Sequence, residues 1–112
     1  MSMLLITIGR LRESGGAALE RYAEGVVPLI GAAGGEVVGR GIPQETVVGD
    51  EGGRPDLVAL IRFPDADAIR QFLGSAAYRA QVRHRDEAFA ELRSYIAADL
   101  LEGPSGRPQP ER

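Results

Sequence analysis

An arginine interrupts an otherwise apolar series of residues in the C-terminal third of the chain. The series has the spacing i, i+4, i+7, i+11, i+14 of one helix face, and its members are Tyr78, Val82, Arg85, Phe89 and Leu92. A guanidinium offers a rigid fork of hydrogen-bond donors that suits a carboxylate or a phosphate. Arg85 is therefore a candidate ligand contact in a pocket between helix and sheet, to which Tyr78 and Tyr22 could present their hydroxyl groups.

The alternative for Arg85 is a structural role. An unpaired buried charge costs several kcal/mol, so the guanidinium needs an internal partner if it faces no ligand. Glu36, Asp99 or a residue of a partner chain are conceivable acceptors, and the side chain could also snorkel to water. The two tyrosines have a structural alternative too, because aromatic residues on apolar helix faces more often belong to the core.

Other residues that could take part in catalysis, metal binding or nucleotide binding are better explained by structural roles. Helix geometry turns His84 about 120° away from Tyr78, which predicts a solvated surface histidine. The acidic pairs Asp65/Asp67 and Asp86/Glu87 do not converge on one ion at their spacing. The glycine-rich stretch from Gly49 to Gly53 has no phosphate-loop lysine and leads into no helix, so it gives no support for nucleotide binding.

Composition excludes further classes of function. The 112 residues contain no Cys, Lys, Trp or Asn, which removes thiolate nucleophiles, Schiff bases and cysteine-ligated metals. We expect no metal and no cofactor. The net charge is -3 and the arginines form no cluster, which argues against nucleic acid as a partner. No segment approaches the ~20 apolar residues of a membrane span and none resembles a signal peptide, so we expect a soluble, cytoplasmic protein.

Apolar patterning predicts the elements that position these residues. Strands are expected over Met3 to Gly9, Glu36 to Ile42, Leu57 to Phe63 and Tyr95 to Leu101, with further extended structure from Gln44 to Val48. A first helix, capped by Ser14 and kinked at Pro28, should end at Gly34 and Gly35. A second helix should begin with a turn capped by Asp65, break at Gly74 and Ser75, and continue from Ala76 to Leu92.

This order is that of an α+β protein with the ferredoxin-like βαββαβ fold, in which a four-stranded antiparallel sheet carries two helices on one face. The first and third strands are apolar on both faces, yet the helices cover only one. The simplest closure is a homodimer in which the open faces of two sheets meet. We assign residues 1–102 to this domain and expect residues 103–112, which have no aliphatic side chain, to be a disordered tail.

The chain also resembles the domain-of-unknown-function 1330 family of dimeric α+β barrel proteins. The matching residues are Tyr22, Pro28, Gly34, Gly35, Arg40, Gly41, Phe63, Pro64, Phe72, Ser75, Tyr78 and Arg85. Arg62 and Leu73 depart from the family's usual pattern, which has an acidic residue before Phe-Pro and an aromatic residue after Phe72. The resemblance implies the fold and dimerisation but no established reaction. Arg40, one of the matching residues, joins Arg85, Tyr78 and Tyr22 as a candidate ligand-binding residue.

Three functions agree with these observations. The first is a homodimeric protein that binds a small molecule, for example an anion, between helices and sheet. The second is a cofactor-independent enzyme of the barrel monooxygenase or isomerase type, although such pockets tend to rely on Asn, Trp and His. The third is a dimeric interaction module without chemistry. No catalytic residue is assigned.

Overall fold

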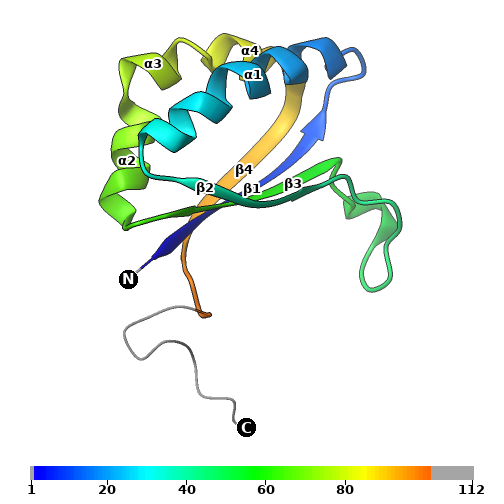
Figure 1. Ribbon diagram of the computed structural model, residues 1–112. Coiled ribbons are helices and arrows are strands. Elements are labelled where there is room, and N and C mark those ends of the chain that lie inside the picture. Colours follow the sequence, from blue (N-terminus) through cyan, green and yellow to red (C-terminus); the bar gives the residue numbers. More distant parts are fainter. Residues whose placement is uncertain (1, 102–112) are drawn as a thin grey trace, which may run out of the picture.

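The structure, a computed structural model, describes residues 2–101 and consists of one sheet covered on one side by helices (Figure 1). The elements in chain order are β1 (Met3–Leu11), α1 (Gly16–Ala32), β2 (Glu36–Gly41), the 3-10 turn η1 (Glu51–Gly53), β3 (Leu57–Phe63), α2 (Ala66–Gly74), α3 (Ala76–Arg79), α4 (Val82–Ala88) and β4 (Phe89–Ala98). The tail assigned to residues 103–112, like Met1, lies outside the described residues.

The four strands form an antiparallel sheet in the order β2-β3-β1-β4. Both inner strands, β1 and β3, pair from Met3 with Phe63 to Gly9 with Leu57. This topology confirms the predicted ferredoxin-like α+β fold. The predicted strand Leu57 to Phe63 is found with the same bounds.

The main core lies between the helices and one face of the sheet. Residues of β1 and β3 that alternate toward the helices pack against α1, α2 and α3, and the buried side chains are Leu5, Val26, Ile30, Ile61, Phe63, Ile69, Phe72 and Tyr78. A second, smaller cluster forms where α4 meets β4, from Ala18, Leu57, Ala88 and Phe89. These two clusters fix the position of the helices relative to the sheet.

The predicted helix from Ala76 to Leu92 is interrupted before α4 and is wrong over its last four residues, Phe89 to Leu92. The chain leaves α4 at Ala88, and Phe89 begins β4 opposite Leu11 with a register shift between Arg10 and Leu11. The Phe89 ring lies over Gly9, where a Cβ atom would come within 2.7 Å of it. Pairing with the full length of β1 therefore overrides the helical periodicity, and the final strand runs from Phe89 to Ala98 rather than from Tyr95 to Leu101.

The boundaries of the other elements agree with the sequence more closely. Asp65 caps α2 through the amide of Ala68 at 2.8 Å, and Gly34 ends the first helix with a φ of +84°. Pro28 lies inside α1 as expected. Ser14 is not the cap of α1, because Gly15 occupies the N-cap position and no side-chain hydrogen bond caps the helix.

The connection between β2 and β3, residues 42–56, is a long arm that extends past the end of the sheet (Figure 1). The predicted extended segment from Gln44 to Val48 is not a strand of the sheet. Hydrogen bonds join the arm to β1, among them two of 2.8 Å each: the Leu11 amide donates to Asp56 Oδ2, and the Asp56 amide donates to the Gly9 carbonyl.

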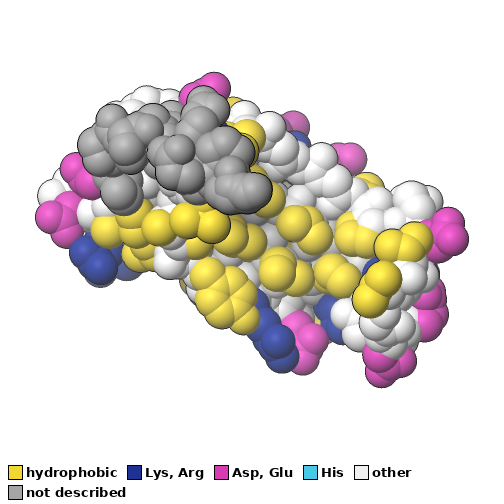
Figure 2. Space-filling model, turned by 90° about the horizontal axis from the view of Figure 1, so that it is seen from below, with side chains coloured by type: hydrophobic (Ala, Val, Ile, Leu, Met, Phe, Trp, Pro, Cys, Tyr) yellow, Lys and Arg dark blue, Asp and Glu magenta, His cyan; other side chains and the backbone are white. Residues whose placement is uncertain are grey.

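The face of the sheet that the helices leave open is apolar, as predicted. The register places alternate residues of three strands on it, namely Leu4, Ile6, Ile8, Val58, Leu60, Tyr95 and Ala97. Figure 2 shows this face, where hydrophobic side chains form a band across the molecule. We call these seven residues the open face. Among residues 2–101, no helix has the length and apolar character that a membrane span requires.

Candidate functional site

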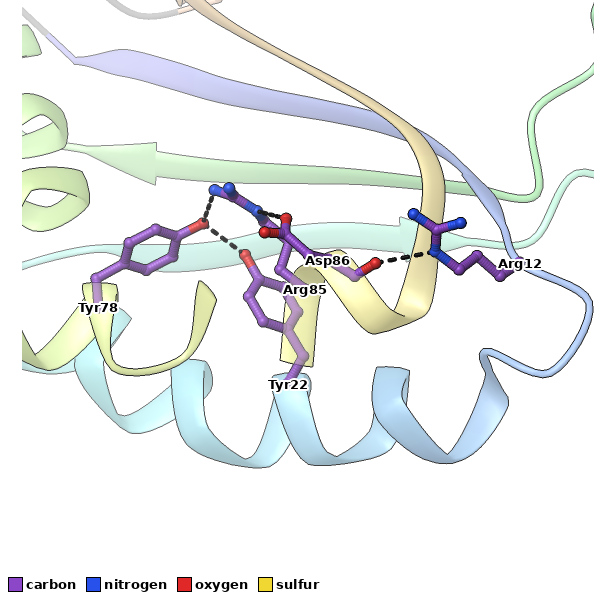
Figure 3. A network of polar contacts seen from close by, with 5 residues as sticks. All are labelled: Arg12, Tyr22, Tyr78, Arg85 and Asp86. Atoms are coloured by element: carbon purple, nitrogen blue, oxygen red, sulfur yellow. Dashed lines mark hydrogen bonds and ion pairs between the residues drawn. The ribbon is translucent and has the colours of Figure 1, made fainter. Parts of the chain in front are cut away.

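Three of the four predicted site residues form one polar network between the helices and the sheet (Figure 3). The hydroxyl groups of Tyr22 and Tyr78 share a hydrogen bond of 2.8 Å. Arg85 Nη1 donates to the Tyr78 hydroxyl at 3.3 Å. The structure therefore brings Arg85, Tyr78 and Tyr22 together, each from a different helix.

A serine cap sets the position of Tyr78. Ser75 Oγ accepts from the Tyr78 amide at 3.1 Å and donates to the Phe72 carbonyl at 2.8 Å, which ends α2 and starts α3 at the same residue. The Tyr78 ring is 5% exposed and meets the rings of Phe72 and Tyr22 at centroid distances of 5.1 and 6.3 Å. Both tyrosines thus belong to the core through their rings and to the site through their hydroxyl groups.

The ionic partner of Arg85 is its neighbour in sequence. Arg85 Nε donates to Asp86 Oδ1 at 3.3 Å, and the two side chains are 31% and 65% exposed. Glu36 and Asp99, the two acceptors named from the sequence, are not its partners, since Arg62 pairs with both Asp99, at 3.0 Å, and Glu36, at 3.7 Å. An ion pair this exposed contributes little to stability, about 0–1 kcal/mol, so Arg85 is not a buried structural bridge.

A cavity of about 90 Å³ lies between α1 and the sheet, beside the tyrosines. Its wall is mostly aliphatic and aromatic, with Leu5, Val26, Ile61 and Phe89 among the residues that line it. Its polar groups come from Tyr22, Tyr78, Thr7, Ser94 and Arg40. Arg40, the fourth predicted site residue, therefore lines this cavity from β2, while the other three form the network.

A second, open groove of about 440 Å³ adjoins the cavity and shares Phe89 and Ser94 with it. Arg85, Asp86 and Arg12 line this groove. Arg12 Nε donates to the Asp86 backbone carbonyl at 2.9 Å, so Asp86 lies between two guanidinium groups (Figure 3). Cavity and groove together place an apolar space next to a cationic one.

The environment favours the neutral form of Tyr22 and the charged form of Arg85. Burial and the hydrogen bond with Tyr78 raise the pKa of Tyr22 above its ordinary value of 10.0. For Arg85, burial lowers the pKa, but the hydrogen bonds and charges of Tyr78 and Asp86 outweigh burial and raise it. The network therefore presents a charged guanidinium that is hydrogen-bonded to the Tyr78 hydroxyl, which in turn contacts the neutral Tyr22.

His84 is less exposed than the sequence suggested. Its side chain is 19% exposed, and Nδ1 lies 3.9 Å from Glu87 Oε1 without a hydrogen-bond partner in the described part of the chain. His84 lines neither the cavity nor the groove. Within residues 2–101, no three His, Asp or Glu side chains gather as metal ligands would.

Arg12 and Asp86 were not among the predicted site residues. Arg12 follows β1 by one position and gave no periodic signal, and Asp86 was considered only as one of an acidic pair that does not converge on an ion. Their proximity depends on the Arg12 amide, which donates to the Ala88 carbonyl at 2.8 Å and joins the end of β1 to the end of α4. Only this tertiary contact brings the two residues together.

Comparisons with known proteins agree on fold and family. Residues 7–99 match the sequence model of a family described as domain of unknown function (DUF1330). A protein of unknown function from Rhodopseudomonas palustris is 23% identical, with a TM-score of 0.80 over 88% of this chain and 82% of that one. No curated protein sequence matches the chain.

More distant structures share the fold alone. A dimeric protein of unknown function with a ferredoxin-like fold from Bacteroides fragilis is 10% identical, with a TM-score of 0.63 over 88% of this chain and 96% of that one. A dimeric ferredoxin-like protein of unknown function from Thermobifida fusca is 15% identical, with a TM-score of 0.61 over 88% and 92% of the two chains.

Proposed function

Since the chain belongs to the DUF1330 family, a domain of unknown function, its role has to be argued from its own site, and we propose that it is a homodimer that binds a small anionic molecule. The observation that carries this proposal is the apolar cavity walled by Tyr22 and Tyr78, whose hydroxyl groups share a hydrogen bond, with the guanidinium of Arg85 bonded to the Tyr78 hydroxyl. A site of this kind suits a ligand with an apolar part and one negatively charged group.

The size of the cavity limits the apolar part of the ligand. A cavity of about 150 Å³ accommodates benzene, so a space of about 90 Å³ suits a group of a few carbon atoms. The adjoining groove has room for the anion beside Arg85 and Arg12. Short-chain carboxylates and small organic phosphates are therefore the ligands we propose, with Arg40 as a second cation at the cavity wall.

Exposure of Arg85 favours a ligand role over a structural one. A buried pair would lose several kcal/mol when one partner is removed, but the Asp86 side chain is 65% exposed and remains hydrated without Arg85. Tyr78 therefore holds the guanidinium in place, although this contact adds little to the free energy of unfolding. Groups preorganised in this way commonly serve binding rather than stability.

The homodimer is proposed from the open face. Seven apolar residues lie on one side of the sheet with no helix above them, and an apolar patch of this kind usually marks an interface. The similar proteins from Bacteroides fragilis and Thermobifida fusca are described as dimeric. A two-fold contact between open faces is self-complementary and removes this patch from water.

A thermal-shift screen of carboxylates and organic phosphates tests the binding proposal. At about a hundred times its Kd, a ligand stabilises a domain of this size enough to raise Tm by about 10 °C. We expect such a shift for at least one anion with wild type and its loss in Arg85→Met. Arg83→Met, in which an exposed arginine of the same helix is changed, is the matched control and should retain the shift.

Two results would contradict the proposal. In the first, no anion in the screen stabilises wild type. In the second, Arg85→Met and Arg83→Met respond equally to the anion that does. Arg40→Met separates the two cations, because it should weaken binding only if the ligand spans the cavity.

A further inference from the structure

The arm formed by residues 42–56 carries apolar side chains into solvent although polar contacts hold it in place. Ile42, Val47 and Val48 are 64%, 85% and 91% exposed. At the same time, Arg10 donates to the Gly52 carbonyl, Arg54 donates to the Gln44 carbonyl, and Arg54 pairs with Glu51 at 3.1 Å. An ordered loop that displays β-branched residues outward has the composition of a contact surface.

A second exposed apolar pair lies at the opposite end of the sheet. Leu100 and Leu101 follow β4 and are 71% and 70% exposed. The register places the end of β4 beside Met3, whereas the arm returns to the sheet beside Gly9. Figure 1 shows that the arm and the end of β4 both bend away from the helices, so they flank the open face at its two ends.

At its arm end, the open face contains a depression of about 370 Å³. Ile8 and Arg93 line it from the sheet, and Gly53 and Pro55 line it from the arm. In Figure 2 the hydrophobic band of the open face extends toward the arm. This depression is large enough for one or two leucine side chains, and it lies on the surface proposed for dimerisation.

We propose that two copies of the chain pack their open faces end over end, so that Leu100 and Leu101 of each copy enter the depression beneath the arm of the other. This inference rests on the proposed homodimer and specifies its orientation. A two-fold axis across the strands exchanges the two ends of the sheet. An axis along the strands would instead keep both depressions at the same end of the interface, with Leu100 and Leu101 of neither copy opposite them, and unfilled space of this kind is what protein interfaces avoid.

The charges of the strands agree with this orientation. Arg93 makes no ion pair with the described residues and lies at the arm end of the open face. At the other end, the carboxylates of Asp99 and Glu36 share the Arg62 guanidinium. End-over-end packing lays β4 of one copy against β4 of the other with its ends exchanged, and so brings Arg93 toward the end of the partner's β4 that Asp99 follows. An axis along the strands would instead place Arg93 over the opposite edge of the partner's sheet.

Cysteine cross-linking tests the orientation without interference, because the natural chain has no cysteine. In the double variant Val48→Cys/Leu100→Cys, we expect oxidation or a short bis-maleimide to give a covalent dimer. Neither single variant should give one. The matched control is Val27→Cys/Leu100→Cys, since Val27 is 48% exposed on α1, on the helix side of the sheet.

Light scattering of the same samples separates the two proposals. If the mass is that of a dimer but the double variant does not cross-link, the proposed orientation is overturned and the proposed homodimer stands. The same holds if the mass is that of a dimer and the single variant Val48→Cys cross-links. A monomer mass overturns both.

A charge on the arm gives a second readout that needs no covalent bond. Val48→Asp should raise the dimer dissociation constant about tenfold, and Val27→Asp should leave it unchanged. Equal dissociation constants for wild type and Val48→Asp also overturn the proposal. Because both positions are exposed in the single chain, circular dichroism should show the same fold in all variants.

Discussion

At the scale of single residues, each of the two tyrosines in the site takes part both in core packing and in polar contacts. The rings of Tyr22 and Tyr78 pack against Phe89 and Phe72, with centroid distances of 6.4 and 5.1 Å. Their hydroxyl groups share a hydrogen bond, and the Tyr78 hydroxyl also accepts from Arg85. A core residue with one polar atom therefore fixes the direction of a guanidinium that is itself partly exposed.

Tyr22→Phe tests this arrangement through its dependence on pH. The pKa of Tyr22 is raised in the folded protein, so above about pH 10 the unfolded chain loses the proton while the folded chain keeps it. Stability therefore falls as the pH rises above this value. Urea unfolding between pH 9 and 11 should show a smaller fall for Tyr22→Phe than for wild type, because the variant has no such proton. An equal fall would contradict the assignment.

At the scale of elements, short caps and close contacts divide the second helical region into three pieces, of which the sequence predicted the break at Ser75 but not the one before α4. Ser75 ends α2 and begins α3, and Gln81 precedes α4. Gly25 of α1 lies against this break, because a Cβ atom there would come within 2.1 Å of Gln81 Oε1. The broken helix lets Tyr78 and Arg85 approach Tyr22 from two directions.

Ser75→Ala is expected to weaken the break. The variant loses the cap of α3 and the bond to Phe72, which lowers the free energy of unfolding by about 1 kcal/mol. Because Tyr78 is then less firmly held, anion binding should weaken as well. Asp65→Ala, which removes the cap of α2 away from the site, should cost similar stability in urea unfolding but leave binding unchanged. Equal effects of both variants on binding would argue against a positioning role for Ser75.

At the scale of the whole molecule, one ionic cluster joins three strands near the chain ends. Arg62 of β3 holds Glu36 of β2 and Asp99, which follows β4. Asp99 is buried, and its carboxylate also accepts from the Leu101 amide at 3.0 Å. This cluster fixes the direction in which Leu100 and Leu101 leave the sheet.

Acid should destabilise the protein through this cluster. The Arg62 hydrogen bond and the Leu101 amide hold the pKa of Asp99 below its ordinary value of 3.8. The stabilisation is therefore present above that value and disappears as the pH falls through the lower pKa of the folded state. Thermal unfolding from pH 6 to pH 2 should show a smaller loss for Asp99→Asn than for wild type. An identical slope would indicate that other carboxylates dominate acid unfolding.

Local and periodic signals in the sequence were sufficient for the fold and for part of the site. Alternation in Met3 to Gly9 and Leu57 to Phe63 predicted two inner strands with two apolar faces, and helical spacing placed Tyr78 and Arg85 near each other. These features depend on neighbours within a few residues, and the physics that produces them is likewise local. The resemblance to the family was inferred from the order of short sequence motifs along the chain.

Tertiary structure decided what distant segments do to one another. Pairing of β1 with Phe89 ended the helix early, since a strand partner outweighed helical propensity. The Arg12 amide bond to Ala88 brought Arg12 to Asp86, and Arg62 took the carboxylates considered for Arg85. Each of these contacts joins residues more than 20 positions apart, so its strength depends on geometry that the fold alone creates and that no spacing in the sequence encodes.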